Sequence, residues 1–191
     1  MSDMALFFGK FLRHGTKIAS LAPSSRFLAE ATIRGIDWDS ADVVVELGAG
    51  TGPITRAIAD HARPECRVLA LERDPDFARL LRERFADKTN VEILEADCRD
   101  LGAILADRGI GRVDHIVSGL PVPSFPLGLR EDLFREVAKV LAPEGSYRQI
   151  TELAWVYQAM YRRYFEDVRF VFEPRNLPPA GAYHCRGAKT L

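Results

Sequence analysis

The stretch "VVELGAGTG" (Val44 to Gly52) decides the fold predicted for this 191-residue chain. It begins as an apolar, β-branched strand and ends in Gly48, Gly50 and Gly52, where a helical pattern begins. Glycines at such a turn permit a tight bend and let a ligand approach the backbone and the helix N-terminus, although ordinary turns also use them. The spacing differs from the G-x-G-x-x-G of dinucleotide-binding proteins, and Glu46 before it suits a ligand that carries positive charge.

From residue 43 onward, short β-branched runs alternate with helical patterns, which predicts parallel strands joined by right-handed crossovers. The segment "EPRNLPPAG" is too short for a crossover helix, so the last two strands are expected to be antiparallel. The predicted fold is α/β: a Rossmann-like, mostly parallel sheet with an antiparallel last strand. The strands expected are Val43–Leu47, Arg67–Glu72, Val91–Glu95, Val113–Ser118, Tyr147–Thr151, Val168–Phe172 and Ala182–Lys189; the helices are Thr51–His61, Pro75–Phe85, Arg99–Ala106, Leu127–Leu141 and Leu153–Phe165.

Composition narrows the functional classes. The net charge is -1, with 26 basic and 27 acidic residues, which argues against a general nucleic-acid-binding protein. Cys66, Cys98 and Cys185 show no CxxC spacing, so we expect reduced thiols and no metal site. No apolar run approaches the roughly 20 residues of a membrane span. No signal peptide is evident at the N-terminus, so we expect the protein in the cytoplasm.

Acidic residues end the next two strands. Glu72 closes "RVLALE", where a carboxylate can accept hydrogen bonds from both hydroxyls of a ribose. Asp97 closes the third strand in "EADCRD" and is placed to reach an adenine amino group, while Cys98 offers a backbone N–H. Asp97 would serve equally well as a helix N-cap, and Glu72 could be an ordinary surface acid.

Taken in order, "ELGAGTG", "LERD" and "EADC" resemble the nucleotide-site motifs of class I S-adenosylmethionine-dependent methyltransferases. The resemblance implies that fold, seven strands included, and S-adenosylmethionine as cofactor, with S-adenosylhomocysteine as product. An NAD-dependent oxidoreductase is the nearest competitor, but it normally carries the other glycine spacing. The cofactor-binding residues implied are Ser24, Ser25, Glu46, Gly48, Gly50, Gly52, Glu72, Arg73, Asp97, Cys98 and Ser118; Ser24 and Ser25 would contact the methionine carboxylate, or serve only as helix N-caps.

The fourth strand runs into a rigid corner, "SGLP" (Ser118 to Pro121). It resembles the Asn-Leu-Pro-Tyr type of motif in methyltransferases that act on amino groups. It lacks the leading amide or acid and the directly following aromatic, for which Phe125 could substitute. We therefore expect a simple amine rather than a nucleobase as substrate, oriented by the Ser118 hydroxyl and the carbonyls of Gly119 and Leu120. A general base is not evident, and the candidates are Tyr183, His14 and water.

Four stretches, "TKIASLAPSS", "VVELGAGTG", "SGLP" and "RNLPPAGAY", together resemble bacterial phospholipid N-methyltransferases of the soluble, rRNA-adenine-dimethylase-like subgroup. The resemblance implies stepwise methylation of phosphatidylethanolamine towards phosphatidylcholine. Two alternatives stay open: an rRNA adenine N6-methyltransferase, and a membrane-binding protein that keeps a vestigial nucleotide site. Candidate partners for methylated head groups are Tyr147, Trp155, Tyr157 and Tyr183; Arg148, Arg175 and Arg186 are candidates for the lipid phosphate.

The chain is predicted to divide into an N-terminal helical segment, residues 1–35, and a methyltransferase domain, residues 36–191. Within the first segment, Met4–Ala19 and Ser24–Ile33 read as helices. The first is amphipathic: its apolar face carries Met4, Phe7, Phe8, Phe11, Leu12 and Ile18, opposite Lys10, Arg13, His14 and Lys17. This helix predicts peripheral attachment to the anionic inner face of the cytoplasmic membrane. A helix packed on the sheet is the alternative. We also expect the protein to be a monomer.

Overall fold

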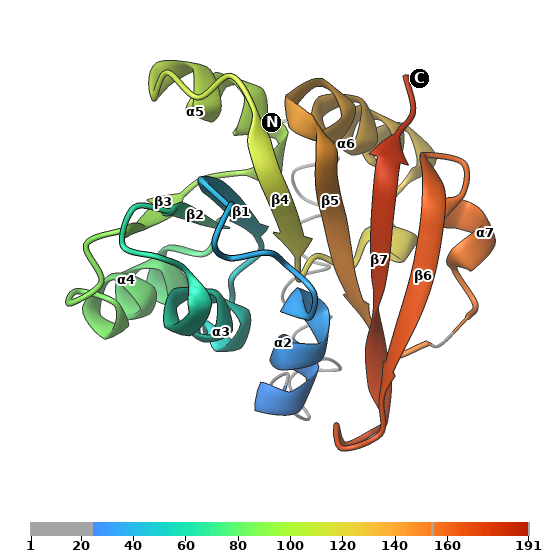
Figure 1. Ribbon diagram of the computed structural model, residues 1–191, viewed down its shortest axis with the longest axis horizontal. Coiled ribbons are helices and arrows are strands. Elements are labelled where there is room, and N and C mark those ends of the chain that lie inside the picture. The colour runs from blue at the N-terminus through green and yellow to red at the C-terminus, as the bar shows by residue number, and fades with distance from the viewer. Residues whose placement is uncertain (1–24, 154, 191) are drawn as a thin grey trace.

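The computed structural model describes residues 25–153 and 155–190, and its centre is a seven-stranded sheet (Figure 1). The strand order is β3-β2-β1-β4-β5-β7-β6. Strands β1 to β5 pair in parallel, and β7 is antiparallel to both β5 and β6, as predicted. The bounds are β1 (Val43–Leu47), β2 (Arg67–Glu72), β3 (Val91–Glu95), β4 (Val113–Ser118), β5 (Leu141–Thr151), β6 (Phe165–Glu173) and β7 (Ala180–Ala188).

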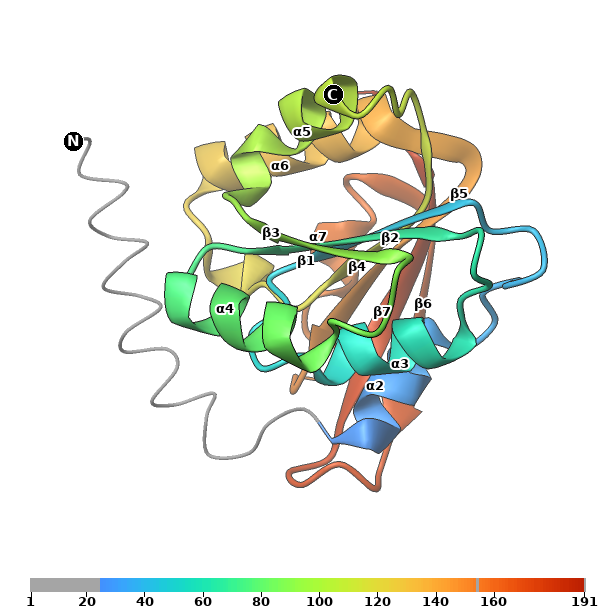
Figure 2. The same cartoon turned by 90° about the vertical axis from the view of Figure 1, so that its left-hand side faces the viewer.

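Helices cover both faces of the sheet (Figure 2). In the turned view α3 and α4 lie on one side of the sheet, and α5 and α6 lie on the other. This is the three-layer arrangement that alternating strands and helices predict. The helices are α2 (Arg26–Ile33), α3 (Pro53–His61), α4 (Pro75–Arg84), α5 (Leu101–Asp107), α6 (Leu127–Val140) and α7 (Gln158–Tyr161), with 3-10 turns η1 (Cys98–Asp100) and η2 (Val122–Ser124).

An aromatic cluster fills the core beneath α6. Phe134 of α6 stacks on Tyr164 at 4.2 Å between ring centroids and meets Tyr147 and Phe165 edge-on. Tyr161 packs against the same ring. Burial of each such side chain contributes about 1.5–3 kcal/mol, so this cluster fixes α6 and the segment before β6 on the sheet.

The predicted helix Leu153–Phe165 is wrong, because among its described residues only Gln158–Tyr161 form a helix and β6 already begins at Phe165. Buried aromatic residues at positions 161, 164 and 165 have helical spacing, but the chain turns between them and buries all three against α6. Strand β5 is also longer than predicted. Residues 142–145 of β5 do not pair with β4, so Pro143, which has no backbone N–H, and Gly145 both lie in the unpaired part.

Helix α2 lies against the sheet and confirms part of the predicted segment Ser24–Ile33. Ser25 caps it, because its hydroxyl accepts from Leu28 N, and Ser25 N donates to Asn176 Oδ1 near β7. Ser24 and the predicted amphipathic helix Met4–Ala19 lie outside the described residues, and the domain boundary after residue 35 stays a prediction. No helix in residues 25–153 and 155–190 is long and apolar enough to cross a membrane.

Candidate active site

The glycine loop after β1 forms a turn in which three glycines adopt the left-handed backbone. The φ angles are 75° at Gly48, 55° at Gly50 and 86° at Gly52, a region that other residues enter at a cost. A Cβ at Gly48 would lie 2.6 Å from the Leu120 side chain, whereas a Cβ at Gly50 would meet nothing within 4 Å. The loop is therefore packed on its flanks and open at Gly50, which leaves room for a ligand against its backbone.

Glu72, at the end of β2, braces this loop. Its Oε2 accepts from Gly50 N at 2.7 Å, and its Oε1 accepts from Asp74 N at 2.8 Å. Each carboxylate oxygen keeps a further lone pair that can accept a ribose hydroxyl. The structure thus brings the predicted diol-binding acid next to the open side of the loop.

Asp97, at the end of β3, is the N-cap of η1 and accepts from Arg99 N at 3.0 Å. Burial raises its pKa, but the Arg99 hydrogen bonds and the charges of Arg99 and Arg73 outweigh this and lower the pKa below its usual value. The neighbouring Cys98 is buried, and burial raises the pKa of its thiol to about 12. The capping role weighed from the sequence is observed; the adenine contact of Asp97 stays a prediction.

Glu46 is fully buried at the end of β1. Its Oε2 accepts from Thr55 Oγ1 at 2.6 Å, but its Oε1 is buried and has no hydrogen-bond partner in the described part of the chain. Burial raises the pKa of this carboxyl to about 7. A buried oxygen without a donor is unfavourable, so the site has an unmet requirement for a hydrogen-bond donor or a cation. The amino and sulfonium groups of S-adenosylmethionine match that requirement.

The substrate corner lies directly against the glycine loop. Gly119 N donates to Leu47 O at 2.9 Å, and a Cβ at Gly119 would lie 2.7 Å from the Gly48 carbonyl oxygen. Leu120 in turn fills the space over Gly48. Ser118 is fully buried beneath the corner, where its Oγ accepts from Leu120 N at 3.3 Å. Because the two motifs interlock, a group held at the corner is adjacent to a ligand in the loop.

Gln149, which no sequence motif singled out, holds this corner from β5. Its buried side-chain amide donates to the carbonyl oxygens of Ser118 at 3.1 Å and Leu120 at 2.7 Å, while its Oε1 accepts from Tyr147 Oη at 2.7 Å. The available signal was a lone amide in the otherwise strand-like "SYRQIT". The Leu120 carbonyl oxygen also accepts from Val122 N at 2.8 Å, so both of its lone pairs are used and the direction of the corner backbone is fixed.

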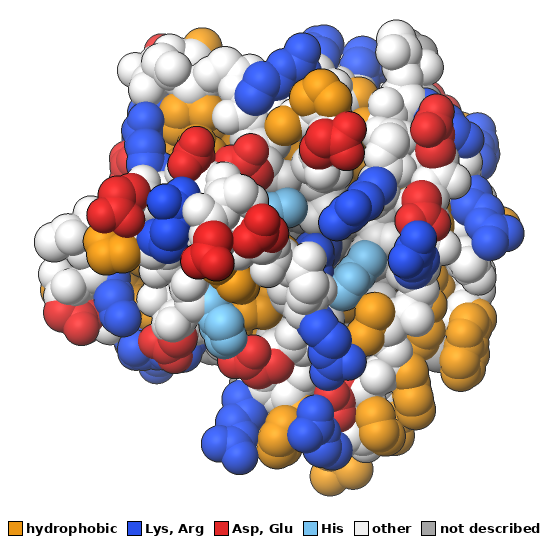
Figure 3. Space-filling model, in the orientation of Figure 1, with side chains coloured by type: hydrophobic (Ala, Val, Ile, Leu, Met, Phe, Trp, Pro, Cys, Tyr) orange, Lys and Arg blue, Asp and Glu red, His pale blue; other side chains and the backbone are white. Residues whose placement is uncertain are grey.

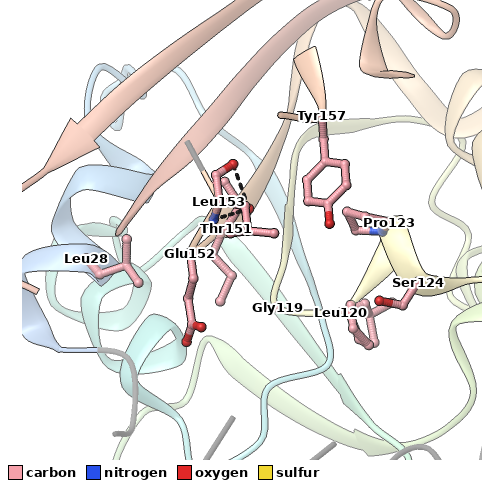
Figure 4. A pocket seen from close by; sticks show the side chains of 11 residues that line it. Leu28, Gly119, Leu120, Pro123, Ser124, Thr151, Glu152, Leu153 and Tyr157 are labelled. Atoms are coloured by element: carbon pink, nitrogen blue, oxygen red, sulfur yellow. Dashed lines mark hydrogen bonds between the residues drawn. The ribbon is translucent and has the colours of Figure 1, made fainter. Parts of the chain in front are cut away.

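A cavity of about 250 Å³ opens over the corner (Figure 4). Its walls come from residues 119–121, 123 and 124, from residues 150–153 after β5, and from Leu28 and Tyr157. In this view the Tyr157 ring points towards the corner. Tyr183 lies outside the lining: it is fully buried, burial raises its pKa, and its hydroxyl oxygen accepts from Tyr157 N at 3.0 Å.

Arg148 does not bind a lipid phosphate, so this prediction is wrong. The side chain is 2% exposed, and its guanidinium donates to the carbonyls of Thr32 and Arg34 and to Ser146 Oγ. Its role is to tie β5 to the end of α2. In the described ranges, moreover, no three His, Cys, Asp or Glu side chains gather in a way that could hold a metal ion.

Residues 44–145 match the family described as "Methyltransferase domain". The solved structure of Aeropyrum pernix fibrillarin, which holds S-adenosylmethionine, superposes with a TM-score of 0.62 at 17% identity over 84% of this chain and 75% of that one. The chain therefore belongs to the class I S-adenosylmethionine-dependent methyltransferases. The residues of the glycine loop, with Glu46 and Glu72, fit that cofactor.

Two curated relatives narrow the comparison. The ornithine lipid N-methyltransferase of Singulisphaera acidiphila is 66% identical over 99% of this chain and 98% of its own length. The ribosomal RNA small subunit methyltransferase A of Alkaliphilus metalliredigens is 32% identical, but over 49% of this chain and 32% of its own length. The first similarity includes the parts of the chain outside the methyltransferase-domain match, and the second covers about half of the chain.

Proposed function

We propose that this protein is a lipid N-methyltransferase whose substrate is the amine of an ornithine lipid. The observation that carries the proposal is the 66% identity to an ornithine lipid N-methyltransferase over nearly the whole of both chains. The geometry supports an amine substrate, because a small cavity opens on a corner of backbone carbonyls beside the cofactor loop.

The bound cofactor supplies an electrophilic methyl group on a sulfonium. The protein must present an amine whose lone pair is free, and a primary ammonium with a pKa of about 10.4 costs roughly 4–5 kcal/mol to deprotonate at pH 7. The Gly119 carbonyl lines the cavity between the carbonyls of Ser118 and Leu120, which Gln149 holds in place, and it accepts an N–H bond so that the lone pair is directed at the methyl. The Ser118 hydroxyl supports the corner from beneath, and such positioning supplies a large share of the rate.

Tyr183, a candidate base in the sequence, fits a supporting role better. Its hydroxyl holds the backbone N of Tyr157, so it fixes a wall of the cavity. The released proton then passes to water that enters the open cavity. A Tyr183→Phe variant that keeps its pH profile while the Michaelis constant for lipid rises fits this role; a lost alkaline limb would restore Tyr183 as the base.

Phosphatidylethanolamine, indicated by the resemblance of the sequence motifs, is the second candidate substrate. It presents the same kind of primary ammonium to the cavity. An rRNA adenine substrate has less support, because the similarity to the rRNA enzyme covers about half of this chain and the net charge is -1. Cofactor contacts from Ser24 and Ser25 remain part of the proposal, and Ser25 already caps the helix that carries the wall residue Leu28.

Access to a lipid requires contact with a bilayer, which we propose to be peripheral. Large apolar side chains near the cavity are exposed: Leu153 by 51%, Trp155 by 62% and Phe172 by 44%. Figure 3 shows hydrophobic side chains gathered near the lower ends of β6 and β7. A Trp at such a surface suits the membrane interface, and the predicted amphipathic helix Met4–Ala19 would add to this attachment.

The direct test incubates the protein with labelled S-adenosylmethionine and vesicles that contain ornithine lipid, phosphatidylethanolamine or neither. Label in the ornithine lipid fraction, with mass spectrometry that places the methyl on the amine, supports the proposal. Label that enters only RNA supplied in a parallel reaction would overturn it. Vesicle sedimentation with and without anionic lipid measures the attachment separately.

A further inference from the structure

One carboxylate in the cavity wall has no structural task. Of the described residues that line the cavity, Glu152 alone carries a formal charge. In the part of the chain that the structure describes, no hydrogen bond or ion pair engages its carboxylate. In Figure 4 its side chain extends between Leu28 and Gly119 and carries no dashed line, unlike its neighbours Thr151 and Leu153.

Two buried acids elsewhere in the fold already have partners. The Glu173 carboxylate is held by Arg175 at 2.7 Å and by Arg34 at 3.7 Å, and Glu72 accepts two backbone N–H groups. Glu152 differs from both, because the residue lies at the cavity and its charge is not compensated there. An anionic group in an otherwise neutral cavity wall favours a cationic ligand.

We propose that Glu152 binds the ammonium group of the lipid substrate and so sets the preference of the cavity for cationic head groups; this inference rests on the proposed function. A primary ammonium remains charged at neutral pH, and the nearby sulfonium of the cofactor repels it. The Glu152 carboxylate offsets that repulsion while the amine enters. Mono- and dimethylated amines keep a charge and an N–H, so they stay ligands, whereas a trimethylated product has no N–H left to donate.

The position of Glu152 suits this role. Its backbone follows directly on β5, the strand whose Gln149 holds the corner carbonyls, so the residue lies next to the corner. The Tyr157 ring lines the same cavity and offers an aromatic face to an alkylated cation. Glu152 is thus a specificity-determining residue, and the methyl transfer itself takes place at the corner.

Glu152→Gln tests the inference, and Glu65→Gln is the control. Glu65 is an exposed acid just before the amino end of β2, whereas Glu152 follows the carboxyl end of β5. With ornithine lipid vesicles, we expect Glu152→Gln to raise the Michaelis constant by about ten-fold, with kcat changed less than about two-fold. Affinity for S-adenosylhomocysteine should stay at the wild-type value in both variants. An unchanged Michaelis constant in Glu152→Gln would overturn the inference.

A second measurement needs no turnover. Calorimetry compares binding of Nα-octanoyl-ornithine and of Nα-octanoyl-norvaline, which lacks the terminal amine, to protein saturated with S-adenosylhomocysteine. We expect the wild type and Glu65→Gln to prefer the amine by about ten-fold and Glu152→Gln to lose the preference. Wild-type protein without this preference, or a preference that survives in Glu152→Gln, refutes the role. If the preference depends on Glu152 but no lipid is methylated, the proposed function fails and the binding role stands.

Discussion

Gly50→Ala tests whether the open side of the glycine loop holds the cofactor, and Gly35→Ala is its matched control. Both glycines have a left-handed φ, 55° and 77°, and a Cβ on either one meets nothing within 4 Å. Alanine at each position therefore adds only the strain of the left-handed conformation, about 1–2 kcal/mol. In a chain of this size, that strain lowers the Tm by about 2–8 °C in both variants.

The two variants should differ in cofactor affinity. Gly50 N donates to the Glu72 carboxylate, so a methyl group at this position enters the space assigned to the ligand, whereas Gly35 lies outside the loop. Overpacking of about 1–3 kcal/mol weakens S-adenosylhomocysteine binding by about five- to 150-fold in Gly50→Ala alone. Calorimetric titration measures this affinity. Equal affinities in Gly50→Ala and Gly35→Ala would refute the placement of the cofactor against Gly50.

Three further outcomes follow from the same site. Gly119→Ala puts a Cβ 2.7 Å from the carbonyl oxygen of Gly48, so initial rates should show kcat/KM lower by about 100-fold. Gly128→Ala, with open space around its Cβ, should match the wild type. Similar rates for both variants would contradict the close contact between the corner and the glycine loop. Gln149→Met removes the side-chain donor from two corner carbonyls, so chemical denaturation should show the free energy of unfolding fall by about 1–3 kcal/mol. We expect kcat to fall and the affinity for S-adenosylhomocysteine to stay the same. A loss of that affinity would place Gln149 in the cofactor site instead. Burial raises the pKa of Glu46 from 4.5 to about 7, so its contribution to stability is full below about pH 4.5 and is lost as the pH rises through about 7. Urea titrations of the cofactor-free wild type should show the unfolding free energy fall by up to roughly 3 kcal/mol between about pH 5 and pH 8, and Glu46→Gln should lose this fall. The same fall in Glu46→Gln would assign it to another group.

The parts of the site that the sequence predicted are the ones that local chemistry dictates. Glycines after a buried strand indicate a tight turn, and the structure has one there, with positive φ at all three glycines. Parallel strands end at the same edge of a sheet, so the order of the motifs along the chain already placed the "SGLP" corner near the glycine loop. Pairing of β1 with β4 makes them neighbours.

The missed features depend on contacts between distant segments. Gln149 reaches the corner because the β4–β5 register skips residues 142–145, and no local pattern encodes that register. The predicted helix Leu153–Phe165 failed because aromatic spacing at 161, 164 and 165 satisfies a helix and a folded turn equally, and packing on α6 decides between them. The sequence around Arg148 does not indicate that its guanidinium is buried and donates to the carbonyls of Thr32 and Arg34, at the end of α2.

The lining of the cavity bears on which lipids are accepted. Among the described residues that form it there is no Lys or Arg, so under the proposed function we expect the amine to enter the cavity and the lipid's anionic group to stay at its mouth. An ornithine head group offers a carboxylate and phosphatidylethanolamine offers a phosphate, but both present a primary ammonium of similar basicity. We therefore expect kcat/KM for the two lipids in mixed vesicles to agree within about ten-fold. The carboxylate of one lipid and the phosphate of the other would both lie in solvent, which screens their charges. A preference of several hundred-fold for either lipid would show that residues outside this lining bind the anion.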